Sequence, residues 1–347
     1  MLKAVLDRIK DALSLGNGSG RPRLKALVSV FVAVFAFLAI VGVYWSFPPS
    51  SFDVADNAAE YTARQQQTIV TGSVTTATLL TVASSLLEKP GGYISNDRMP
   101  PGLWLDNIAN WEFGVLVQIR DLSKAMREAF SRSQSQSKED ADLAEAEPRF
   151  NFDNNSWLLP ASESQYREGI EYLGAYLDEL SDPASREAQF YTRADNLRYW
   201  LSTVDSRLGS LSQRLSASVG QKRINTDLSG DPEAARSTAV PAEMEVQTSW
   251  LEIDDVFYEA RGTSWALIHF LKAVEIDFAD VLVKKNALVS LRQIIRELEA
   301  TQESVFSPMI LNGSGFGLFA NHSLVMASYI SRANAALIDL RDLLAQG

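Results

Sequence analysis

The chain has 347 residues, of which 46% are hydrophobic and 10% aromatic, a composition typical of a folded protein. It contains no cysteine and only two histidines, His269 and His322, which excludes disulfides, thiol catalysis and metal sites rich in cysteine or histidine. We therefore predict no cofactor and no metal. The net charge of −11 is unevenly placed, because residues 1–46 carry six basic and two acidic side chains. The remainder is acidic enough to repel nucleic acid.

Residues 1–26 form a basic tail that we expect to stay in the cytoplasm. Its apolar side chains fall on one helical face: Leu2, Val5, Leu6, Ile9 and Leu13. That pattern is typical of a short helix on an anionic membrane surface. A poorly ordered tail is the alternative, because the glycines between 16 and 20 separate this segment from the apolar run that begins at Leu27. The sequence leaves both possibilities open.

Residues 27–46 are predicted to be a transmembrane anchor. The run from Leu27 to Trp45 has no charge over 19 residues, and a helix of that length measures about 28 Å, close to the hydrocarbon thickness of a bilayer. Arg23 and Lys25 stand just before it, which predicts a cytoplasmic N-terminus and residues 52–347 on the far side of the membrane. A cleaved signal peptide is disfavoured, because the apolar run exceeds the usual core of about 7–15 residues.

Apolar residues recur at alternating three- and four-residue steps through the rest of the chain, which predicts an all-α, elongated multi-helix bundle. The clearest run misses no step: Phe190, Ala194, Leu197, Leu201, Val204, Leu208, Leu211 and Leu215. A run in the same phase precedes it: Tyr166, Ile170, Leu173, Leu177 and Leu180. Between them, Asp182 can cap a helix and Pro183 can occupy its first position. We expect an αα-hairpin of long heptad-phased helices, with a second arm of about 35 residues.

The same spacing predicts three further helices, marked by Val115, Ile119, Leu122 and Met126; by Leu288, Leu291, Ile295 and Leu298; and by Met326, Tyr329, Ala333, Ala336, Leu340 and Leu343. A weaker, threonine-rich helix is expected over 62–88. Polar stretches at 131–149 and 221–249 are predicted to be mobile loops. They divide the ectodomain into parts that can share one bundle: 52–130, 150–220 and 250–347.

The segment 252–278 is predicted to be a central helix, because apolar side chains cover most of its circumference. One stripe is conventional core: Ile253, Phe257, Ala260, Ser264, Leu267, Leu271, Val274 and Phe278. Polar and aromatic groups beside it form a candidate site: Asp254, Asp255, Tyr258, Glu259, Arg261, Trp265 and His269. They could make a polar ligand pocket, an acid–base pair or a cation site. The more frequent alternative is a structural network, with Asp254 pairing with Arg261 or with a neighbouring helix.

A second unusual segment runs from Phe306 to His322 and mixes apolar residues with three glycines. Its candidate binding residues are Asn312, Gly313, Ser314, Gly315, Phe316, Gly317, Phe319 and His322. A phosphate cradle is weakly supported, because no lysine follows and no strand precedes the glycines. A loop packed as a plug at the end of the bundle is favoured over an exposed loop that binds a partner.

Several long strings, among them GGYISNDRMPPG, NWEFGVLVQIRD, DDVFYEARGTSWALIHFLKA and LNGSGFGLFANHSLVMASYISRANAALIDLRDLL, resemble a bacterial family of unknown function. Members of that family resemble this chain throughout, with a short tail, one membrane anchor and a helical ectodomain. The resemblance implies a bacterial inner-membrane protein that faces the periplasm. No established activity comes with the family, so no catalytic residue is carried over.

Two functions from different classes remain. The favoured one is a non-enzymatic envelope protein that binds another protein or acts as a scaffold, held in place by its anchor. Long heptad-phased helices and the lack of nucleophile-elbow, phosphate-loop or zinc-protease motifs favour it. The alternative is a ligand-binding protein or a hydrolase-like enzyme that uses the polar stripe of 252–278.

Overall fold

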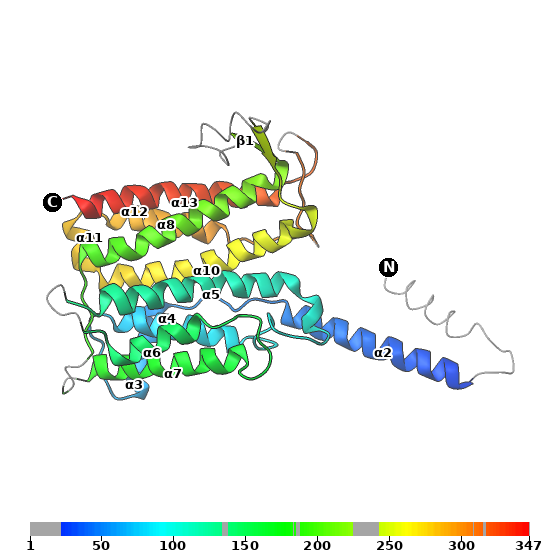
Figure 1. The fold of residues 1–347 in the computed structure, drawn as a ribbon, viewed down its shortest axis with the longest axis horizontal. Helices are drawn as coiled ribbons and strands as arrows, with labels where there is room; N and C mark the ends of the chain where they lie inside the picture. Colours follow the sequence, from blue (N-terminus) through cyan, green and yellow to red (C-terminus); the bar gives the residue numbers. More distant parts are fainter. Residues whose placement is uncertain are drawn as a thin grey trace, which may run out of the picture.

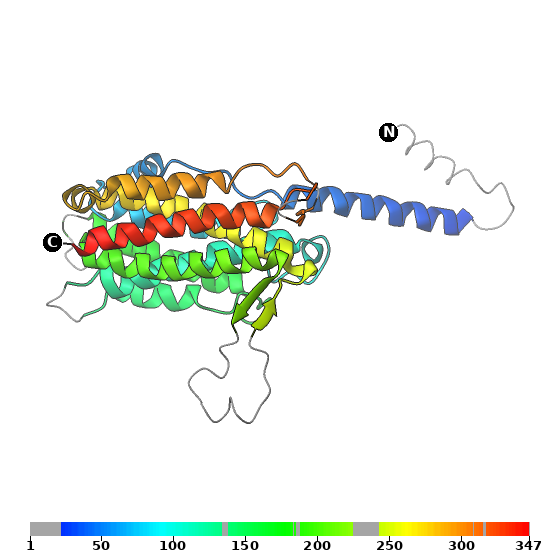
Figure 2. The same cartoon turned by 90° about the horizontal axis from the view of Figure 1, so that it is seen from above.

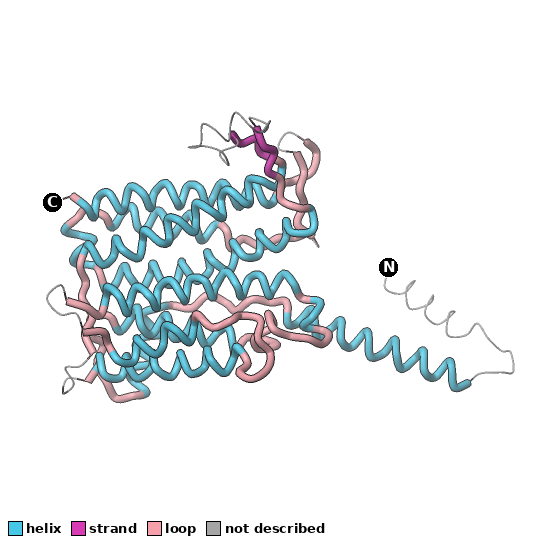
Figure 3. Tube along the Cα trace, viewed as in Figure 1, coloured by secondary structure: helices cyan, strands magenta, loops and turns pink. Residues whose placement is uncertain are grey.

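The structure, a computed structural model, describes residues 22–133, 138–182, 184, 188–224, 243–307, 309–314 and 317–346. The tail before residue 22, most of the predicted loop 221–249, and Gly315 and Phe316 lie outside the described residues. Within them, helices dominate and the strands form one small antiparallel pair, β1 (Gln221–Ile224) with β2 (Glu243–Val246) (Figure 3). The predicted all-α class is confirmed.

In chain order the α-helices are α2 (Pro22–Trp45), α3 (Val54–Arg64), α4 (Ser73–Glu88), α5 (Asp106–Ala125), α6 (Ala141–Phe150), α7 (Ser162–Ser181), α8 (Ala194–Ser216), α10 (Ile253–Asp277), α11 (Ala279–Lys284), α12 (Leu288–Ala300) and α13 (His322–Ala345). Short 3-10 turns precede α5 (η1, Gly102–Trp104) and α10 (η4, Trp250–Glu252). A π-helical turn, η2 (Met126–Phe130), extends α5.

Helix α10 is the centre of the bundle, as its sequence predicted. All eight residues of its predicted core stripe are buried, and the helix packs on α5 along most of its length and also on α4, α12, α8 and α13. Helices from all three predicted parts of the ectodomain therefore share one hydrophobic core. In Figures 1 and 2 the long helices lie side by side, and α2 projects from one end.

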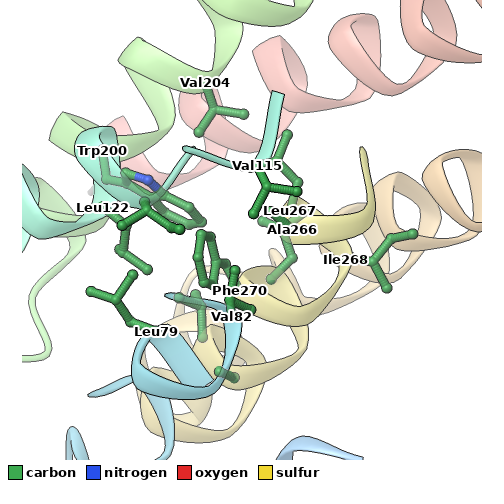
Figure 4. Packing of buried hydrophobic residues seen from close by; sticks show 14 of the residues in the cluster. Leu79, Val82, Val115, Leu122, Trp200, Val204, Ala266, Leu267, Ile268 and Phe270 are labelled. Carbon is green, nitrogen blue, oxygen red and sulfur yellow. The ribbon is translucent and has the colours of Figure 1, made fainter. Parts of the chain in front are cut away.

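Close packing around α10 brings large apolar side chains from four helices together (Figure 4). Phe270 and Leu267 of α10 lie among Leu79 of α4, Val115 of α5 and Trp200 of α8, all without measurable exposure. Burying a side chain of this size contributes about 1.5–3 kcal/mol, so this layer is a large part of what holds the helices together.

Carboxylates and an amide fix where several helices begin. Asp53 Oδ1 accepts hydrogen bonds from the first turn of α3, and Asp140 Oδ1 does the same for α6. Asn321 Oδ1 accepts from Leu324 N at 2.9 Å and caps α13. Helix α4 has a glycine at its N-cap and receives its cap from elsewhere: Asp277, at the end of α10, accepts from Gly72 N and Thr75 N at 2.8 and 2.7 Å.

The predicted αα-hairpin is wrong, although both of its helices exist. The heptad-phased positions of α8 from Leu197 to Leu215 are buried, but α8 packs chiefly on α13, while α7 packs on α6 and α4. The second arm is also shorter than expected, because α8 begins only at Ala194 and the residues from Ala188 to Arg193 lie outside any helix. Tyr191 N in this stretch donates to Phe130 O at 2.7 Å, which fixes the chain before α8 to the π-helical turn η2.

Three predicted loop or helix boundaries are also corrected. The polar stretch 131–149 contains α6, which buries Leu143 and Ala146 against α7. The expected helix over 62–88 is broken: α3 ends at Arg64 and α4 begins at Ser73. Residues at the two ends of the predicted loop 221–249 pair as β1 and β2, so these ends are strands and not loop.

Helix α2 is long and apolar enough to cross a membrane, and only 6% of its apolar window is buried. Its last turns rest against the bundle. A Cβ on Gly42 would lie 3.4 Å from Pro101 and 3.7 Å from Leu105, so the loop before α5 lies against this face of α2. The rings of Phe35 and Trp104 are 5.9 Å apart.

Candidate functional site

The polar groups of α10 each reach a different neighbour. Asp255 Oδ1 accepts a hydrogen bond from Asn110 Nδ2 of α5 at 2.7 Å. Glu259 forms a two-pronged ion pair with Arg214 of α8, with Nη1 2.8 Å from Oε2. Burial, followed by the charges of Asp254 and other nearby carboxylates, raises the pKa of Asp255 to about 6. These two carboxylates therefore connect α10 to α5 and to α8.

Arg261 does not pair with Asp254, which corrects that part of the predicted network. Its guanidinium donates to the main-chain carbonyls of Glu303 and Gln302, at 2.8 and 3.0 Å, just after α12 ends. Gln302 Nε2 donates back to Arg261 O at 3.2 Å. Arg261 thus fixes the C-terminal end of α12, where unpaired carbonyls favour a cation. Burial lowers the pKa of Arg261.

His269 is 1% exposed, and both of its ring nitrogens are engaged. Nδ1 lies 2.7 Å from Trp265 O and donates to it, since a carbonyl can only accept, and Nε2 then accepts from Phe52 N at 3.2 Å. The ring stacks on Phe52 at 4.2 Å and meets Trp265, which in turn meets Trp111. Burial lowers the pKa of His269 to about 4. This neutral imidazole holds the segment after α2 against the central helix.

The remaining two members of the stripe are half-buried. The Asp254 charge raises the pKa of Asp255, and the ring of Tyr258 meets Phe257 edge-on at 5.6 Å. The stripe residues therefore face α5, α8, the end of α12 and the segment before α3, instead of converging on one reacting atom. In the described residues these side chains contact neighbouring elements of the bundle.

The described residues at the tip of the loop 306–322 are exposed, so the favoured prediction of a packed plug is wrong. Phe306 is 97% exposed, and Leu318 and Phe319 also face outward. The base of the loop is held by a short ladder in which Gly313 N donates to Ala320 O and His322 N donates to Leu311 O, each at 3.0 Å.

Side chains strengthen this base. Asn321 Nδ2 donates to Asn312 Oδ1 at 2.7 Å, and Asn312 Nδ2 donates to Ser218 O at 2.9 Å. Leu311 N donates to His322 Nδ1 at 3.1 Å. Of the predicted binding residues, Asn312, Gly313 and His322 therefore build the base, whereas Ser314, Gly317 and Phe319 are exposed.

One open groove of about 430 Å³ brings the two predicted regions together. Arg261 and Phe257 come from α10, His322 from the loop base, and Val325 and Tyr329 from α13. The other lining residues come from the end of α12 and the segment after it: Ala300, Thr301, Glu303, Ser304, Val305, Phe306 and Ser307, with Met326 of α13. The groove is mainly apolar, with a guanidinium at one side.

Arg261 keeps unused binding capacity in this groove. A guanidinium has five N–H donors, and the hydrogen bonds described above go to two carbonyls. In the described part of the chain no ion pair joins it to a carboxylate, unlike Arg214 or Arg207. The groove therefore offers an apolar surface with a cation that forms no ion pair in the described part of the chain, and the acidic Glu303 also lines it.

The most deeply buried charges were not predicted. Lys89 Nζ and Glu112 Oε1 lie 2.6 Å apart, and neither side chain is exposed. Glu112 also accepts from Ile94 N and Ser95 N, and Lys89 donates to Gly92 O at 2.5 Å. Burial raises the pKa of Glu112, while the Lys89 charge opposes that shift. The sequence contained one signal for this network. Glu112 follows Trp111 and lies on a helix face that is otherwise apolar.

Comparison with known proteins gives a family without an activity. The family described as "Uncharacterized protein conserved in bacteria (DUF2333)" matches residues 21–347. The chain belongs to this family. No curated protein and no solved structure matches the chain. The match covers α2 and the whole bundle, so the anchor-like helix is part of the DUF2333 family and not an addition to it.

Proposed function

We propose that this DUF2333 chain is an inner-membrane protein, anchored by α2 with its helical domain in the periplasm, that works by binding a protein partner. The observation that carries the proposal is the distribution of polar groups on α10. Asp255, Glu259, Arg261 and His269 each bind a different element, so they stabilise the bundle and do not form an acid–base constellation.

The groove between α10, α12 and α13 is the proposed binding surface. It is open, mainly apolar and bordered by the exposed loop 306–322. An apolar segment of a partner can fill it, and a carboxylate on that partner can pair with Arg261, because this guanidinium has donors left and no acidic partner of its own. Buried apolar contact with one charge-assisted bond is a common basis for specific recognition.

Site-specific photocrosslinking in intact cells tests this function. A photoreactive residue in place of Val325, inside the groove, is expected to give a discrete adduct with another protein. The matched control carries the same group at Ile338, which is exposed on the same helix but outside the groove. Adducts of equal yield at both positions, or none at Val325, would contradict a groove-binding partner. Mass spectrometry of the adduct identifies the partner.

A second candidate function is supported by the same guanidinium. An apolar groove with one unpaired cation also suits a small amphiphile that carries a carboxylate or phosphate. If the ligand is of this kind, native mass spectrometry of the full chain purified from membranes will show a bound small molecule. Arg261→Gln should release it, and Arg296→Gln, an exposed arginine on α12, should not.

A further inference from the structure

The end of the bundle from which α2 projects carries a set of exposed apolar side chains. Helices α5, α7, α10 and α13 begin at this end, so the segments that precede them lie at the same end of the bundle as α2 (Figures 1 and 2). Their exposed members are Met99, Leu103 and Trp104; Trp157, Leu158 and Leu159; Trp250 and Leu251; Phe306 and Met309; and Leu318 and Phe319. We call this set the anchor-side apolar surface.

The tryptophan and phenylalanine content distinguishes this surface from the rest of the bundle. Among the described residues after position 50, every exposed tryptophan and phenylalanine belongs to it. Toward the opposite end of the bundle the exposed large side chains include the aliphatic Val283 and Val289 and one tyrosine, Tyr199, which is 40% exposed. Tryptophan is enriched where proteins meet the interface between lipid and water, because its ring is apolar at one side and donates a hydrogen bond at the other.

The loop before α5 decides what this surface faces. Trp104 meets Phe35, which precedes Trp45 by ten residues, or about 15 Å along the helix axis. Pro101 and Leu105 lie against Gly42 of the same helix. If α2 crosses a membrane over Leu27–Trp45, a loop packed beside Phe35 cannot remain in water. It must enter the hydrocarbon of the adjoining leaflet.

The composition of this loop suits such a position. Between Arg98 and Asp106 every residue is apolar or glycine, and two are prolines, which have no N–H to satisfy. The amides of Leu103, Trp104 and Leu105 donate within the loop, to Met99, Pro101 and Gly102 carbonyls at 3.1, 2.9 and 2.9 Å. Internal hydrogen bonds are what lipid demands of a polypeptide backbone, because hydrocarbon offers no partners.

The base of the loop is fixed by buried charges. Glu112 binds Ile94 N and Ser95 N, and its ion pair with Lys89 is closed off from solvent. Gly91 lies against the ring of Trp45, where a Cβ would come within 2.7 Å. The segment from Lys89 to Leu105 is therefore held both to α5 and to the end of α2.

We propose that the anchor-side apolar surface docks on the lipid bilayer, with the 99–105 loop inserted beside α2 and the other loops at the lipid interface. The proposal rests on the membrane anchor proposed above. Asp106, Glu252, Asp254 and Asp255 lie at the same end, and their charges oppose an anionic surface. Docking is therefore driven by insertion of apolar side chains, and we expect the surface to bind zwitterionic bilayers at least as well as anionic ones.

The absence of cysteine allows a direct test on the full chain. Single-cysteine variants Leu103→Cys, Trp250→Cys and Leu318→Cys are labelled with an environment-sensitive fluorophore and reconstituted in phosphatidylcholine vesicles that contain brominated lipid. The matched control is Val289→Cys, which is exposed and apolar but lies at the opposite end. Phe37→Cys, within α2, reports whether the anchor is in the bilayer.

Docking predicts quenching at residues 37, 103, 250 and 318, strongest at 37 and 103, and none at 289. Replacing part of the lipid with phosphatidylglycerol should not increase it. Quenching at 37 without quenching at 250 and 318 overturns docking and leaves the anchor intact, and it would assign those loops to a protein. Loss of quenching at residue 37 overturns the anchor, and docking with it.

Discussion

At the scale of single residues, Arg261 shows how a pattern can locate an important side chain and still give it the wrong partner. The spacing of polar residues placed Asp254 and Arg261 on one stripe of α10, and it predicted a buried ion pair between them or with a neighbouring helix. The guanidinium instead reaches the carbonyls of Gln302 and Glu303, a contact between segments about 40 residues apart that no local pattern encodes.

Arg261→Met should lower the free energy of unfolding by about 1–3 kcal/mol, the scale of hydrogen bonds to a charged group. A larger loss, about 3–5 kcal/mol, is typical where a buried carboxylate is left unpaired, and here none is. Arg296→Met is the control, because Arg296 is exposed on α12, and it should change stability by less than about 0.5 kcal/mol. Denaturant unfolding of both variants measures the difference, and equal effects would contradict the role given to Arg261.

His269 predicts a pH dependence of stability. Its folded pKa of about 4 lies below the unfolded value of about 6.5, so between these values the unfolded chain binds more protons. The histidine therefore contributes stability above pH 6.5 that is lost as the pH falls toward 4, at up to about 1.4 kcal/mol per pH unit. The stability difference between wild type and His269→Gln should decrease over this window.

Asp255 supplies a control of opposite sign. Its folded pKa of about 6 lies above the unfolded value, so the folded chain binds more protons and gains stability as the pH falls through 6. The difference in free energy of unfolding between wild type and Asp255→Asn should therefore increase as the pH falls over the same window. Parallel curves for wild type and both variants would contradict the described environments of the two side chains.

At the scale of elements, α5 and α10 approach each other through glycine. A Cβ on Gly114 would lie 2.1 Å from Glu259 O, and one on Gly262 would lie 2.0 Å from Trp111 O, so the two backbones meet directly. Gly114→Ala should cost about 1–3 kcal/mol or more, because main-chain atoms cannot move aside as a side chain can.

Gly209→Ala is the matched control for this crossing. Gly209 also lies inside a helix, but the nearest atom to its added Cβ is Asn334 Nδ2 at 3.7 Å. The alanine should stabilise α8 by about 0.5–1 kcal/mol, since glycine loses more backbone freedom on folding. Thermal unfolding of the two variants checks that Gly114→Ala lowers stability and that Gly209→Ala raises it. A Gly114→Ala variant as stable as wild type would show that the helices separate easily.

Most helices were predictable, and their pairing was not. Three- and four-residue spacing marked the buried faces of α5, α8 and α12, and three of the six predicted core positions of α13, because that period is local. Helix α8 packs on α13, which begins more than 100 residues later in the chain, and not on its sequence neighbour α7. This pairing depends on the shapes of the packed side chains, which the spacing of apolar residues does not specify. The polar composition around α6 hid a helix whose buried face needs only Leu143, Ala146 and Phe150.

At the scale of the whole molecule, helix α2, the buried base of the 99–105 loop and the apolar end of the bundle form one connected structure. Phe52 binds His269 in the centre of the bundle, Gly91 meets Trp45, and Trp104 meets Phe35. The bundle is thus joined to α2 at several depths and not through a free linker. The sequence indicated the anchor from 19 uncharged residues, but the loop beside it was invisible to a hydropathy pattern because it is too short.

The positively charged tail predicts the side of the membrane on which the bundle lies. Residues 1–26 have a net charge of +4, from six basic and two acidic side chains, and positive flanks remain cytoplasmic. A reporter that is active only outside the cytoplasm, fused after Gly347, should therefore be active. Deleting Leu27–Trp45 should abolish that activity, because no other described helix is long and apolar enough to export the domain. Activity of a cytoplasm-dependent reporter on the intact chain would contradict the orientation, and the apolar surface would then dock on the inner face of the same membrane.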